Sequence, residues 1–351
     1  MRQRPVRVLV IGPSNIGDAI LAGGVVAAVH RHLPESHLTL VVGERAQPLF
    51  AEDPRVHTLV DADAFDSPLG RLKLAFALWR YQPHVVVDLR HTLYPLLLKP
   101  LAAWRYLRQP PKPLTHMRER YLWKLRAQVP LVARARDEEG SSSLKTAEHA
   151  SIWFTPKDRA HVEGLWRRWG LDNASPLIVI CPGARSHIKR WSIDGFARVA
   201  DRLVGELHAQ VVFSGEPSEE PVIEEILGLM RQRAHSAVSL VTIRQLGVLM
   251  ARARLVITND SASLHLASAV DVPTVAIFGP TDERKYGPTA AHHRTIRRRL
   301  FCAPCEQALC RFHHECMRFI SPGEVLEAAM ALLQEGARGT GHGAREGRRT
   351  L

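Results

Sequence analysis

Residues Arg254–Asp282, RLVITNDSASLHLASAVDVPTVAIFGPTD, decide the fold class of this chain. Two short apolar runs rich in β-branched residues, Leu255–Ile257 and Thr274–Phe278, are typical of buried parallel strands. Each run is followed by small polar residues at which a helix can begin, Asn259–Ser261 and Gly279–Asp282. Parallel strands end at the same edge of a sheet, so the two turns predict a ligand crevice there. The N–H groups of a first helical turn favour a phosphate at this edge.

Composition places the chain among globular proteins and points to anionic partners. It has 351 residues, of which 46% are hydrophobic and 23% charged, enough for two domains with ordinary cores. The formal net charge of +12 favours nucleic acid, phospholipid headgroups or phosphorylated substrates, although a solvated basic surface is the simpler alternative. No nucleic-acid-binding motif is recognisable, so we do not expect nucleic acid as a partner.

Targeting signals are not evident in the sequence. Charged residues interrupt every apolar run well before the about 18 residues that a membrane span needs. The first apolar run, Val8–Ile11, is too short for the core of a signal peptide and leads directly into a glycine turn. We therefore interpret it as a core strand and predict a cytoplasmic protein.

The first glycine turn differs from a dinucleotide-binding turn in two respects. It follows the expected strand Val6–Ile11 and precedes an expected helix at 18–33. Ser14 occupies the position of the middle glycine, and Asp18 places a carboxylate where a pyrophosphate would lie. Asp18 is therefore a candidate general base, although it could also serve only to cap the helix.

Residues 90–126 are rich in basic and aromatic side chains. Such a segment could bind a large amphipathic anion or contact a membrane surface. Solvated helices with buried aromatic residues would give much the same composition. Both interpretations remain open at the level of the sequence.

A second alternation of strands and helices begins after residues 155–176. Its first expected strands are Leu177–Cys181, Gln210–Phe213 and Val238–Leu240. The turn after the first strand carries Lys189 between other cations, and the turn after the second carries Glu219. A diphosphate between Lys189 and the helix that begins near Asp260, with a ribose against Glu219, fits this order of residues.

Four motifs in this order resemble glycosyltransferase family 9, the ADP-heptose:lipopolysaccharide heptosyltransferases and their relatives. They are VLVIGPSNIGDAIL, PGARSHIKRWSIDGFARVADRL, TNDSASLHLASA and VAIFGPTD, and the resemblance runs from about Val6 to Leu333. It implies an α/β fold of GT-B architecture, with two Rossmann-like doubly wound domains that face each other across a cleft. The implied reaction is inverting transfer of a sugar from a nucleotide diphosphate to an acceptor hydroxyl, usually without a metal and with no other cofactor.

The resemblance also implies a division of the chain. Residues 1–172 would form the N-terminal, acceptor-side domain and residues 173–320 the C-terminal domain that binds the nucleotide sugar. A C-terminal helix at 321–335 would pack back on the N-terminal domain. The glycine- and arginine-rich residues 336–351 are expected to be a disordered tail.

Site residues follow from the matched motifs. Asp18 matches the base that deprotonates the acceptor, and Lys189 matches the lysine that holds the donor phosphates. The residues expected at the donor are Gly183, Arg190, Glu219, Asp260, Ser261, Ser263, His265, Gly279, Thr281 and Asp282. Those expected at the acceptor are Ser14, Asn15, Arg90, Arg118 and Arg120.

The expected donor is ADP-heptose, and the expected acceptor is an anionic, lipid-linked saccharide of the lipopolysaccharide-core type at the inner membrane surface. The turn before Lys189 contains Ser186 and His187 where many heptosyltransferases have an acidic residue, which leaves another nucleotide sugar and another surface glycan as an alternative. A non-catalytic nucleotide- or lipid-binding protein on the same fold is a second alternative. The presence of both Asp18 and Lys189 disfavours it, because a binding module needs no base.

Four cysteines lie close together in the sequence, at Cys302, Cys305, Cys310 and Cys316. A reduced thiol cluster or a local disulfide is the ordinary interpretation, and a reducing cytoplasm argues against a permanent disulfide. Zinc is the weaker alternative, because one short loop supplies every thiol and lacks the pattern of two knuckles. We therefore expect no catalytic metal.

Overall fold

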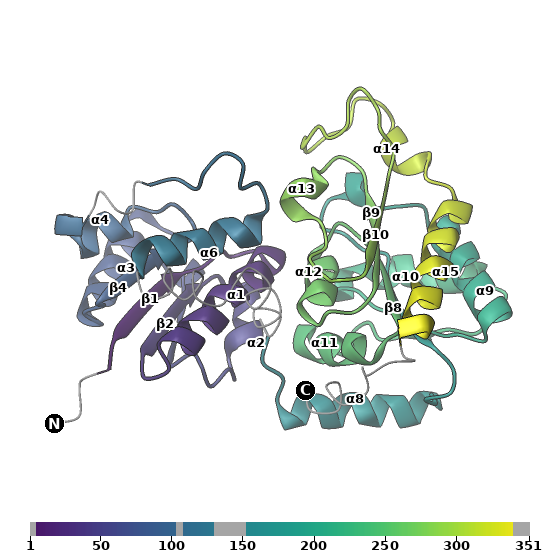
Figure 1. Ribbon diagram of the computed structural model, residues 1–351, viewed down its shortest axis with the longest axis horizontal. Helices are drawn as coiled ribbons and strands as arrows, with labels where there is room; N and C mark the ends of the chain where they lie inside the picture. The colour runs from purple at the N-terminus through teal and green to yellow at the C-terminus, as the bar shows by residue number, and fades with distance from the viewer. Residues whose placement is uncertain (1–4, 103–107, 130–151, 340–351) are drawn as a thin grey trace. The chain divides into compact units, whose positions relative to one another are not determined.

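The computed structural model describes residues 5–102, 108–129 and 152–339, which form two compact units that divide between residues 155 and 156 (Figure 1). The sequence analysis placed this division at residue 172. It comes earlier because helix α8 (Pro156–Trp169) packs against α11 (Ile243–Arg252) of the second unit. A buried ion pair joins these two helices, with Arg244 Nε 3.2 Å from Asp158 Oδ2.

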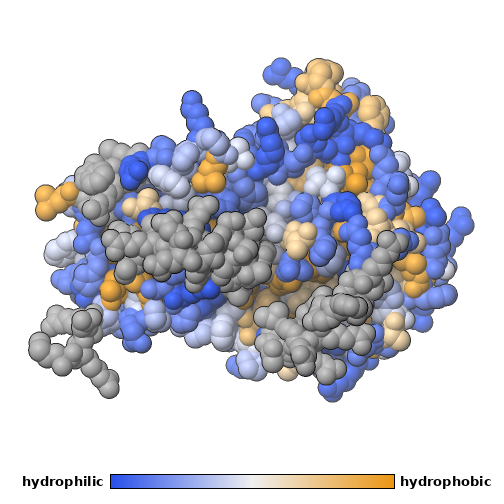
Figure 2. Space-filling view, in the orientation of Figure 1, coloured by the Kyte–Doolittle hydropathy of each residue, from blue (hydrophilic) through white to orange (hydrophobic). Residues whose placement is uncertain are grey.

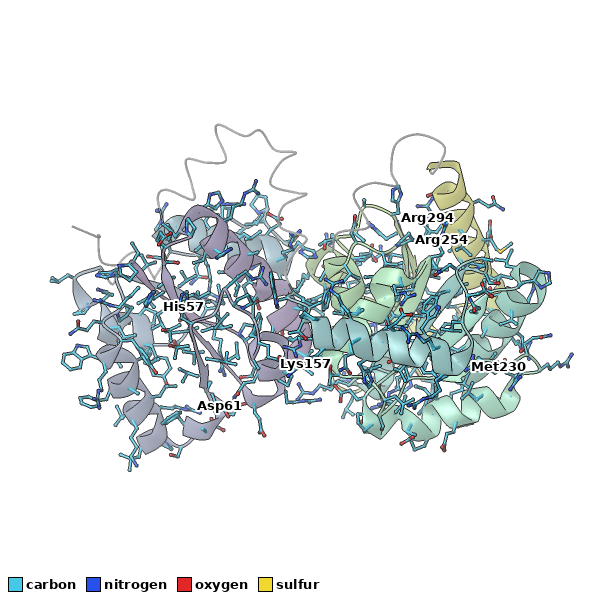
Figure 3. The ribbon with its side chains drawn as sticks, turned by 90° about the horizontal axis from the view of Figure 1, so that it is seen from below. His57, Asp61, Lys157, Met230, Arg254 and Arg294 are labelled. Atoms are coloured by element: carbon cyan, nitrogen blue, oxygen red, sulfur yellow. The ribbon has the colours of Figure 1, made fainter. Side chains whose placement is uncertain are left out.

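The first unit is built on a parallel sheet of four strands in the order β3-β2-β1-β4. Its strands are β1 (Arg7–Ile11), β2 (His37–Val42), β3 (Thr58–Asp61) and β4 (Val85–Asp88). Its helices are α1 (Ile16–His32), α2 (Gln47–Phe50), α3 (Pro68–Arg80), α4 (Tyr94–Leu98) and α6 (Met117–Gln128). Figure 3 labels His57, the residue before β3, and Asp61, the last residue of β3.

The strands of the first unit are apolar because both faces of the sheet are covered. Val10 pairs with Leu40 on one side and with Val87 on the other, and all three are buried. Leu74 and Leu78 of α3 pack against this sheet as part of its core. Such continuous apolar runs are what a parallel sheet between helices requires.

The second unit contains a parallel sheet of six strands in the order β10-β9-β8-β5-β6-β7. Its strands are β5 (Leu177–Cys181), β6 (Gln210–Phe213), β7 (His235–Ser236), β8 (Leu255–Asn259), β9 (Thr274–Phe278) and β10 (His293–Arg297). Besides α8 and α11, its helices are α9 (Ile193–Leu207), α10 (Glu220–Leu229), α12 (Ala262–Ala269), α13 (Glu283–Tyr286), α14 (Glu315–Arg318) and α15 (Pro322–Gly339).

One prediction about the second unit was wrong. The strand expected at Val238–Leu240 is β7 at His235–Ser236 instead, and the later residues turn, with Ser239 at a positive φ of 59°. The predicted packing of the C-terminal helix on the N-terminal domain stays a prediction, and within the second unit α15 packs on α9 and on β8, β9 and β10. The reason is its apolar face, from which Val325 and Ala329 join the core of the second unit.

Helix α15 continues to Gly339, past the expected start of the tail at residue 336, and residues 340–351 lie outside the described part of the chain. Within the described ranges, the helices are either too short or too polar to cross a lipid bilayer.

Candidate active site

In both sheets, the strand order reverses beside the first strand of the unit. In the first unit β1 lies between β2 and β4, and in the second unit β5 lies between β6 and β8. At such a point the loops at the carboxyl ends of neighbouring strands diverge and leave a crevice for ligands. The turn that carries Asp18 follows β1, and the turn that carries Lys189 follows β5. Each candidate catalytic residue therefore follows a strand at the switch point of its own sheet.

An ion pair lies at the point of the second sheet where the strand order reverses. Lys189 lies in a short 3-10 turn after β5, and its Nζ is 2.7 Å from Oδ2 of Asp260, which follows β8. The Asp260 side chain is 5% exposed and that of Lys189 is 31% exposed. Lys189 thus lies next to the helix that follows Asp260, and a diphosphate between the two stays a prediction. The lysine stays accessible enough to exchange a carboxylate partner for a phosphate.

Asn259, which the sequence analysis did not single out, holds the two turns together. Its side-chain N–H donates to the carbonyl oxygen of Pro182 at 2.6 Å, and its side-chain oxygen accepts from the backbone N–H of Trp191 at 3.2 Å. The residue is fully buried. Asn259 thereby fixes both ends of the segment that carries Lys189. Helix α9 follows the N-cap residue Ser192, whose hydroxyl accepts from the N–H of Gly195.

Two glycines make room for the carboxyl group of Glu219. A Cβ atom on Gly183 would lie 2.0 Å from the carboxyl carbon, and one on Gly215 would lie 2.6 Å from Oε2. Oε2 accepts from the backbone N–H of Glu216 at 2.9 Å. Burial raises the pKa of Glu219, against the opposing effect of the Glu216 N–H. The carboxyl group thus lies on the turn after β5, with Arg190 among the charges that act on it.

We predict that Gly183→Ala lowers the free energy of unfolding by about 1–3 kcal/mol, because the new methyl group overlaps a buried carboxyl group. Urea denaturation measures this change. The matched control is Gly228→Ala in α10, where an added Cβ meets nothing within 4 Å. The control is expected to be more stable than the wild type by about 0.5–1 kcal/mol. Equal stability of Gly183→Ala and wild type would contradict the close packing of Glu219.

The turn after β8 brings together the predicted donor residues of that motif. Ser261 occupies the N-cap position of α12 without a capping hydrogen bond from its side chain, and its hydroxyl lies 3.3 Å from that of Thr258. Ser263 forms a hydrogen bond with the thiol of Cys181, whose pKa burial raises to about 12. His265 is buried, with its ring 6.5 Å from that of Tyr286.

The turn after β9 carries Thr281 and Asp282, both of which are buried. Asp282 caps the short helix α13, and its carboxylate is paired with the guanidinium of Arg284 at 2.8 Å. Their hydrogen bond holds the pKa of Asp282 below its usual range. Gly279 is packed so tightly that a Cβ atom there would lie 2.5 Å from the sulfur of Met317. Asp282 is therefore an ionised carboxylate in a rigid turn.

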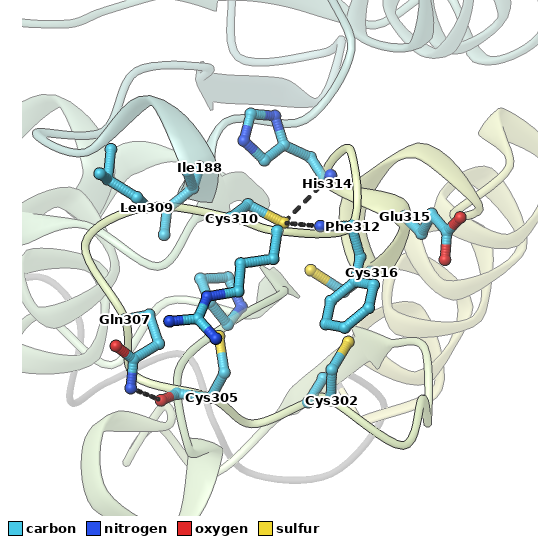
Figure 4. Close-up of a pocket in the computed structure, with 13 residues that line it drawn as sticks. Ile188, Cys302, Cys305, Gln307, Leu309, Cys310, Phe312, His314, Glu315 and Cys316 are labelled. Carbon is cyan, nitrogen blue, oxygen red and sulfur yellow. Dashed lines mark hydrogen bonds between the residues drawn. The ribbon is translucent and has the colours of Figure 1, made fainter.

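The four clustered cysteines line one cavity of about 270 Å³, together with Ile188 from the lysine turn and Pro280 from the turn after β9 (Figure 4). The Cys310 sulfur accepts from the backbone N–H groups of Phe312 and His314, both at 3.3 Å. Burial and the other three thiols raise the pKa of Cys316 to about 11.

No disulfide joins any of these thiols. In the described ranges, no group of three or more His, Cys, Asp or Glu side chains is arranged to hold a metal ion, so the zinc alternative gains no support. Glu306, within this loop, donates its backbone N–H to the carbonyl oxygen of Pro280 at 2.8 Å. The cysteine loop therefore supports the turn that carries Asp282.

In the first unit, Asp18 lies in the first turn of α1, where the helix dipole favours a carboxylate. The N-cap is Asn15, which is exposed, so Asp18 is not the N-cap residue. Ser14 donates a hydrogen bond to Asp63 at 3.3 Å, and the other oxygen of Asp63 accepts from the N–H of Glu44 at 2.9 Å. Ser14 and Asn15 thus lie between β1 and α1, and Asp18 lies in the helical turn that follows them.

The basic residues predicted at the acceptor are less closely grouped. Arg90 is exposed on the loop after β4, next to the turn that follows β1. Arg120 donates to the carbonyl oxygen of Leu114 at 3.2 Å. The Nε atom of Arg118 lies 3.7 Å from the position of a Cβ on Gly24. Gly24 is about 9 Å along α1 from Asp18, at a rise of about 1.5 Å per residue. Of these arginines, Arg90 is the best placed at the sheet edge.

Lys124, within the basic segment but not among the predicted site residues, lies at this edge as well. Its Nζ donates to the carbonyl oxygen of Asp88, the last residue of β4, at 2.8 Å. Burial lowers the pKa of Lys124 to about 8, although Asp88 opposes the shift. Burial and the charge of Lys124 also lower the pKa of His91. A lysine in a run of basic residues gives no sequence signal that distinguishes it from a solvated one.

Known proteins resemble this chain in sequence and in fold. The model of glycosyltransferase family 9 (heptosyltransferase) matches residues 100–315. Lipooligosaccharide heptosyltransferase 2 of Campylobacter jejuni is 25% identical over 337 residues, which cover 92% of this chain and 97% of that protein. The glycosyltransferase family 9 protein of Veillonella parvula superposes with a TM-score of 0.75 at 23% identity, over 95% of this chain and 99% of that one.

The structure of Escherichia coli ADP-heptose lps heptosyltransferase II superposes with a TM-score of 0.68 at 22% identity, over 95% of this chain and all of that one. Both superpositions establish the fold, which is GT-B with two Rossmann-like units. The family model spans more than half of the sequence and includes the turns with Lys189, Glu219, Asp260 and Asp282. The chain therefore belongs to glycosyltransferase family 9 and is a glycosyltransferase.

Proposed function

We propose that this protein transfers heptose, or a closely related sugar, from an ADP-sugar to a hydroxyl group of a lipopolysaccharide-core acceptor, with inversion at the anomeric carbon. The observation that carries the proposal is the match along 92% of the chain to a protein named as a heptosyltransferase. The Escherichia coli protein of the same fold is named for ADP-heptose and lps.

In the proposed step, the acceptor oxygen forms a bond to the anomeric carbon while the bond from that carbon to the diphosphate oxygen breaks. The acceptor proton passes to the Asp18 carboxylate, and ADP departs with the bonding electron pair. A positioned carboxylate of this kind contributes about 10²–10⁴ in rate. Positive charge and helix N–H groups at the departing diphosphate increase the rate further, because they stabilise the negative charge that develops on it.

Residues of the second unit would hold the donor. Lys189 pairs with the diphosphate in place of Asp260, and Glu219 accepts hydrogen bonds from the ribose. Released from Lys189, Asp260 lies where positive charge develops on the sugar, which suits an oxocarbenium-like transition state. The remaining donor contacts are assigned to Gly183, Arg190, Ser261, Ser263, His265, Gly279, Thr281 and Asp282.

The acceptor would contact the first unit. Ser14 and Asn15 are polar groups on the turn of Asp18, and Arg90, Arg118 and Arg120 supply positive charge for phosphate or carboxylate groups of the acceptor. A lipid-linked acceptor of this kind would bring the protein to the inner face of the cytoplasmic membrane as a peripheral protein.

A panel of nucleotide sugars tests the donor. ADP-heptose is expected to be consumed fastest in the presence of a heptose-deficient lipopolysaccharide core, with ADP released in proportion to the heptose transferred. UDP- and GDP-linked sugars serve as matched controls. Faster consumption of one of these would favour a relative that builds another surface glycan. Binding of ADP without turnover of any sugar would favour a nucleotide-binding module.

A further inference from the structure

Helix α3 is apolar on two opposite sides, although only one of them is buried. Leu74 and Leu78 pack into the core of the first unit. On the other side, four large apolar residues at spacings of three and four lie on one face of the helix. They are Leu69, Leu72, Phe76 and Trp79, which are 63%, 64%, 62% and 57% exposed. The rings of Phe76 and Trp79 stack at 6.0 Å in this exposed position. An apolar helix face that is exposed to solvent marks a site of contact with another protein or with a membrane.

The exposed surface continues onto α4, which packs against α3 (Figure 1). Leu93 and Leu97 are 72% and 59% exposed, and Leu101 in the following turn is 98% exposed. Hydrophobic side chains project over α4 at the left margin of Figure 2. We call this surface the α3–α4 face, formed by Leu69, Leu72, Phe76, Trp79, Leu93, Leu97 and Leu101.

The charges around the α3–α4 face are mostly positive. Residues 66–102 contain five Lys and Arg residues, namely Arg71, Lys73, Arg80, Arg90 and Lys99, and two acidic residues, Asp88 and Asp66, of which Asp66 forms a surface ion pair with Arg71. The Asp88 carboxylate accepts from the backbone N–H groups of Arg90 and Thr92. Its charge is therefore engaged within its own loop, and the face presents leucine and aromatic side chains among cations.

We propose that the α3–α4 face inserts into the headgroup region of an anionic lipid bilayer. Leu, Phe and Trp side chains flanked by Lys and Arg are the composition of interfacial helices, where the aliphatic stems of the cations cover apolar surface and their charges reach the phosphates. A second copy of the chain fits less well, because a symmetric dimer would place the same face, and its cations, against each other.

The position of the face within the first unit agrees with this partner. Helix α4 follows β4, and β4 lies beside β1 in the sheet. The turn with Asp18 follows β1, at the same edge from which the chain leaves β4 for Arg90 and α4. This inference rests on the proposed function in one respect, since a bilayer contact here would hold a lipid-linked acceptor close to the proposed base.

Sedimentation with lipid vesicles tests the inference on the full chain. Wild type is expected to bind vesicles of phosphatidylglycerol and phosphatidylcholine more tightly than pure phosphatidylcholine vesicles. Binding should weaken from about 0.1 M to about 1 M salt, where the Debye length falls from about 10 to about 3 Å. The double variant Phe76→Ser/Trp79→Ser should bind anionic vesicles at least about tenfold more weakly, since two large side chains no longer leave water.

Phe301→Ser/Leu229→Ser is the matched control, because it removes two apolar residues of the second unit that are 87% and 52% exposed. It should bind vesicles like wild type. Both variants replace exposed side chains, and circular dichroism checks that they fold. A second variant, Lys73→Ser/Arg80→Ser, should lose most of the preference for anionic vesicles.

Unchanged vesicle binding by Phe76→Ser/Trp79→Ser would overturn the inference, as would equal loss in the control. A wild-type dimer that this variant dissociates, with vesicle binding unchanged, would make the face a subunit interface instead. Transfer to a delipidated core oligosaccharide separates the two proposals. Phe76→Ser/Trp79→Ser should retain transfer to this soluble acceptor. A wild-type protein that binds vesicles but transfers no sugar would refute the proposed function and leave the membrane inference intact.

Discussion

Asp18→Asn is expected to lower the rate of sugar transfer by about 10²–10⁴ while leaving the affinity for ADP nearly unchanged. Asparagine has nearly the same size as aspartate and can hydrogen-bond at the same place, but it cannot accept the proton of the acceptor hydroxyl. Asp18 belongs to the first unit, whereas the proposed ADP contacts belong to the second. Single-turnover transfer and calorimetry with ADP measure the two quantities.

Asp66→Asn is the matched control, since Asp66 is an exposed carboxylate of the same unit that forms a surface ion pair with Arg71. Its transfer rate should equal that of wild type. An Asp18→Asn protein that turns over at close to the wild-type rate would remove Asp18 from the base role. A variant that instead loses ADP affinity would assign Asp18 to the donor.

Lys189→Ala is expected to weaken ADP binding by roughly 10- to 150-fold, which corresponds to the about 1.5–3 kcal/mol of a hydrogen bond to a charged group. Binding of adenosine, which has no phosphate, should change less than about twofold. Calorimetry with both ligands makes the comparison within one protein. Lys189→Arg should restore part of the ADP affinity, because a guanidinium also pairs with phosphate.

Loss of Lys189 also leaves the Asp260 carboxylate buried without the ion pair that the structure shows at 2.7 Å. The stability cost should be smaller than the about 3–5 kcal/mol of a fully buried pair, because the lysine is partly exposed. Arg202→Ala, which removes a surface ion pair with Glu206 on α9, controls for loss of a cation from this unit. Equal weakening of ADP and adenosine by Lys189→Ala would place the lysine away from the phosphates.

The turns at the carboxyl ends of the strands could be predicted, because the sequence pattern that marks them is local. Strand Leu255–Asn259 is buried throughout and begins with apolar residues, and the small polar residues Asp260 and Ser261 follow it directly. Parallel strands end at one edge, so the proximity of Lys189 to Asp260 followed from the order of the turns. In the structure β5 and β8 are neighbours, and the side chains of Lys189 and Asp260 form an ion pair.

Features that depend on distant packing could not be predicted. The side chain of Asn259 links Pro182 and Trp191 across two turns, and no local pattern marks an asparagine for that role. Helix α8 precedes the second sheet in the sequence, yet α11 holds it in the second unit. Strand β7 is short, and the apolar residues near Val238 that suggested a strand form the turn after it.

The α3–α4 face shows a further limit of sequence patterns. Leucines at every second to fourth position of α3 are compatible with burial of either side of the helix. Only the structure shows that Leu74 is in the core while Leu72 is 64% exposed. The sequence of residues 90–126 indicated a basic surface. It did not indicate that exposed apolar side chains of α3 and α4 lie close to some of these basic residues.

The mass of the acceptor after reaction tests the central claim most directly. Incubation of wild-type protein with ADP-heptose and a heptose-deficient lipopolysaccharide core should add the mass of one heptose residue to the core and release one ADP. The same mixture with Asp18→Asn should show little product in the same time. A core whose mass stays unchanged with wild type and ADP-heptose, but increases with a different nucleotide sugar, would contradict heptose transfer as the function of this protein.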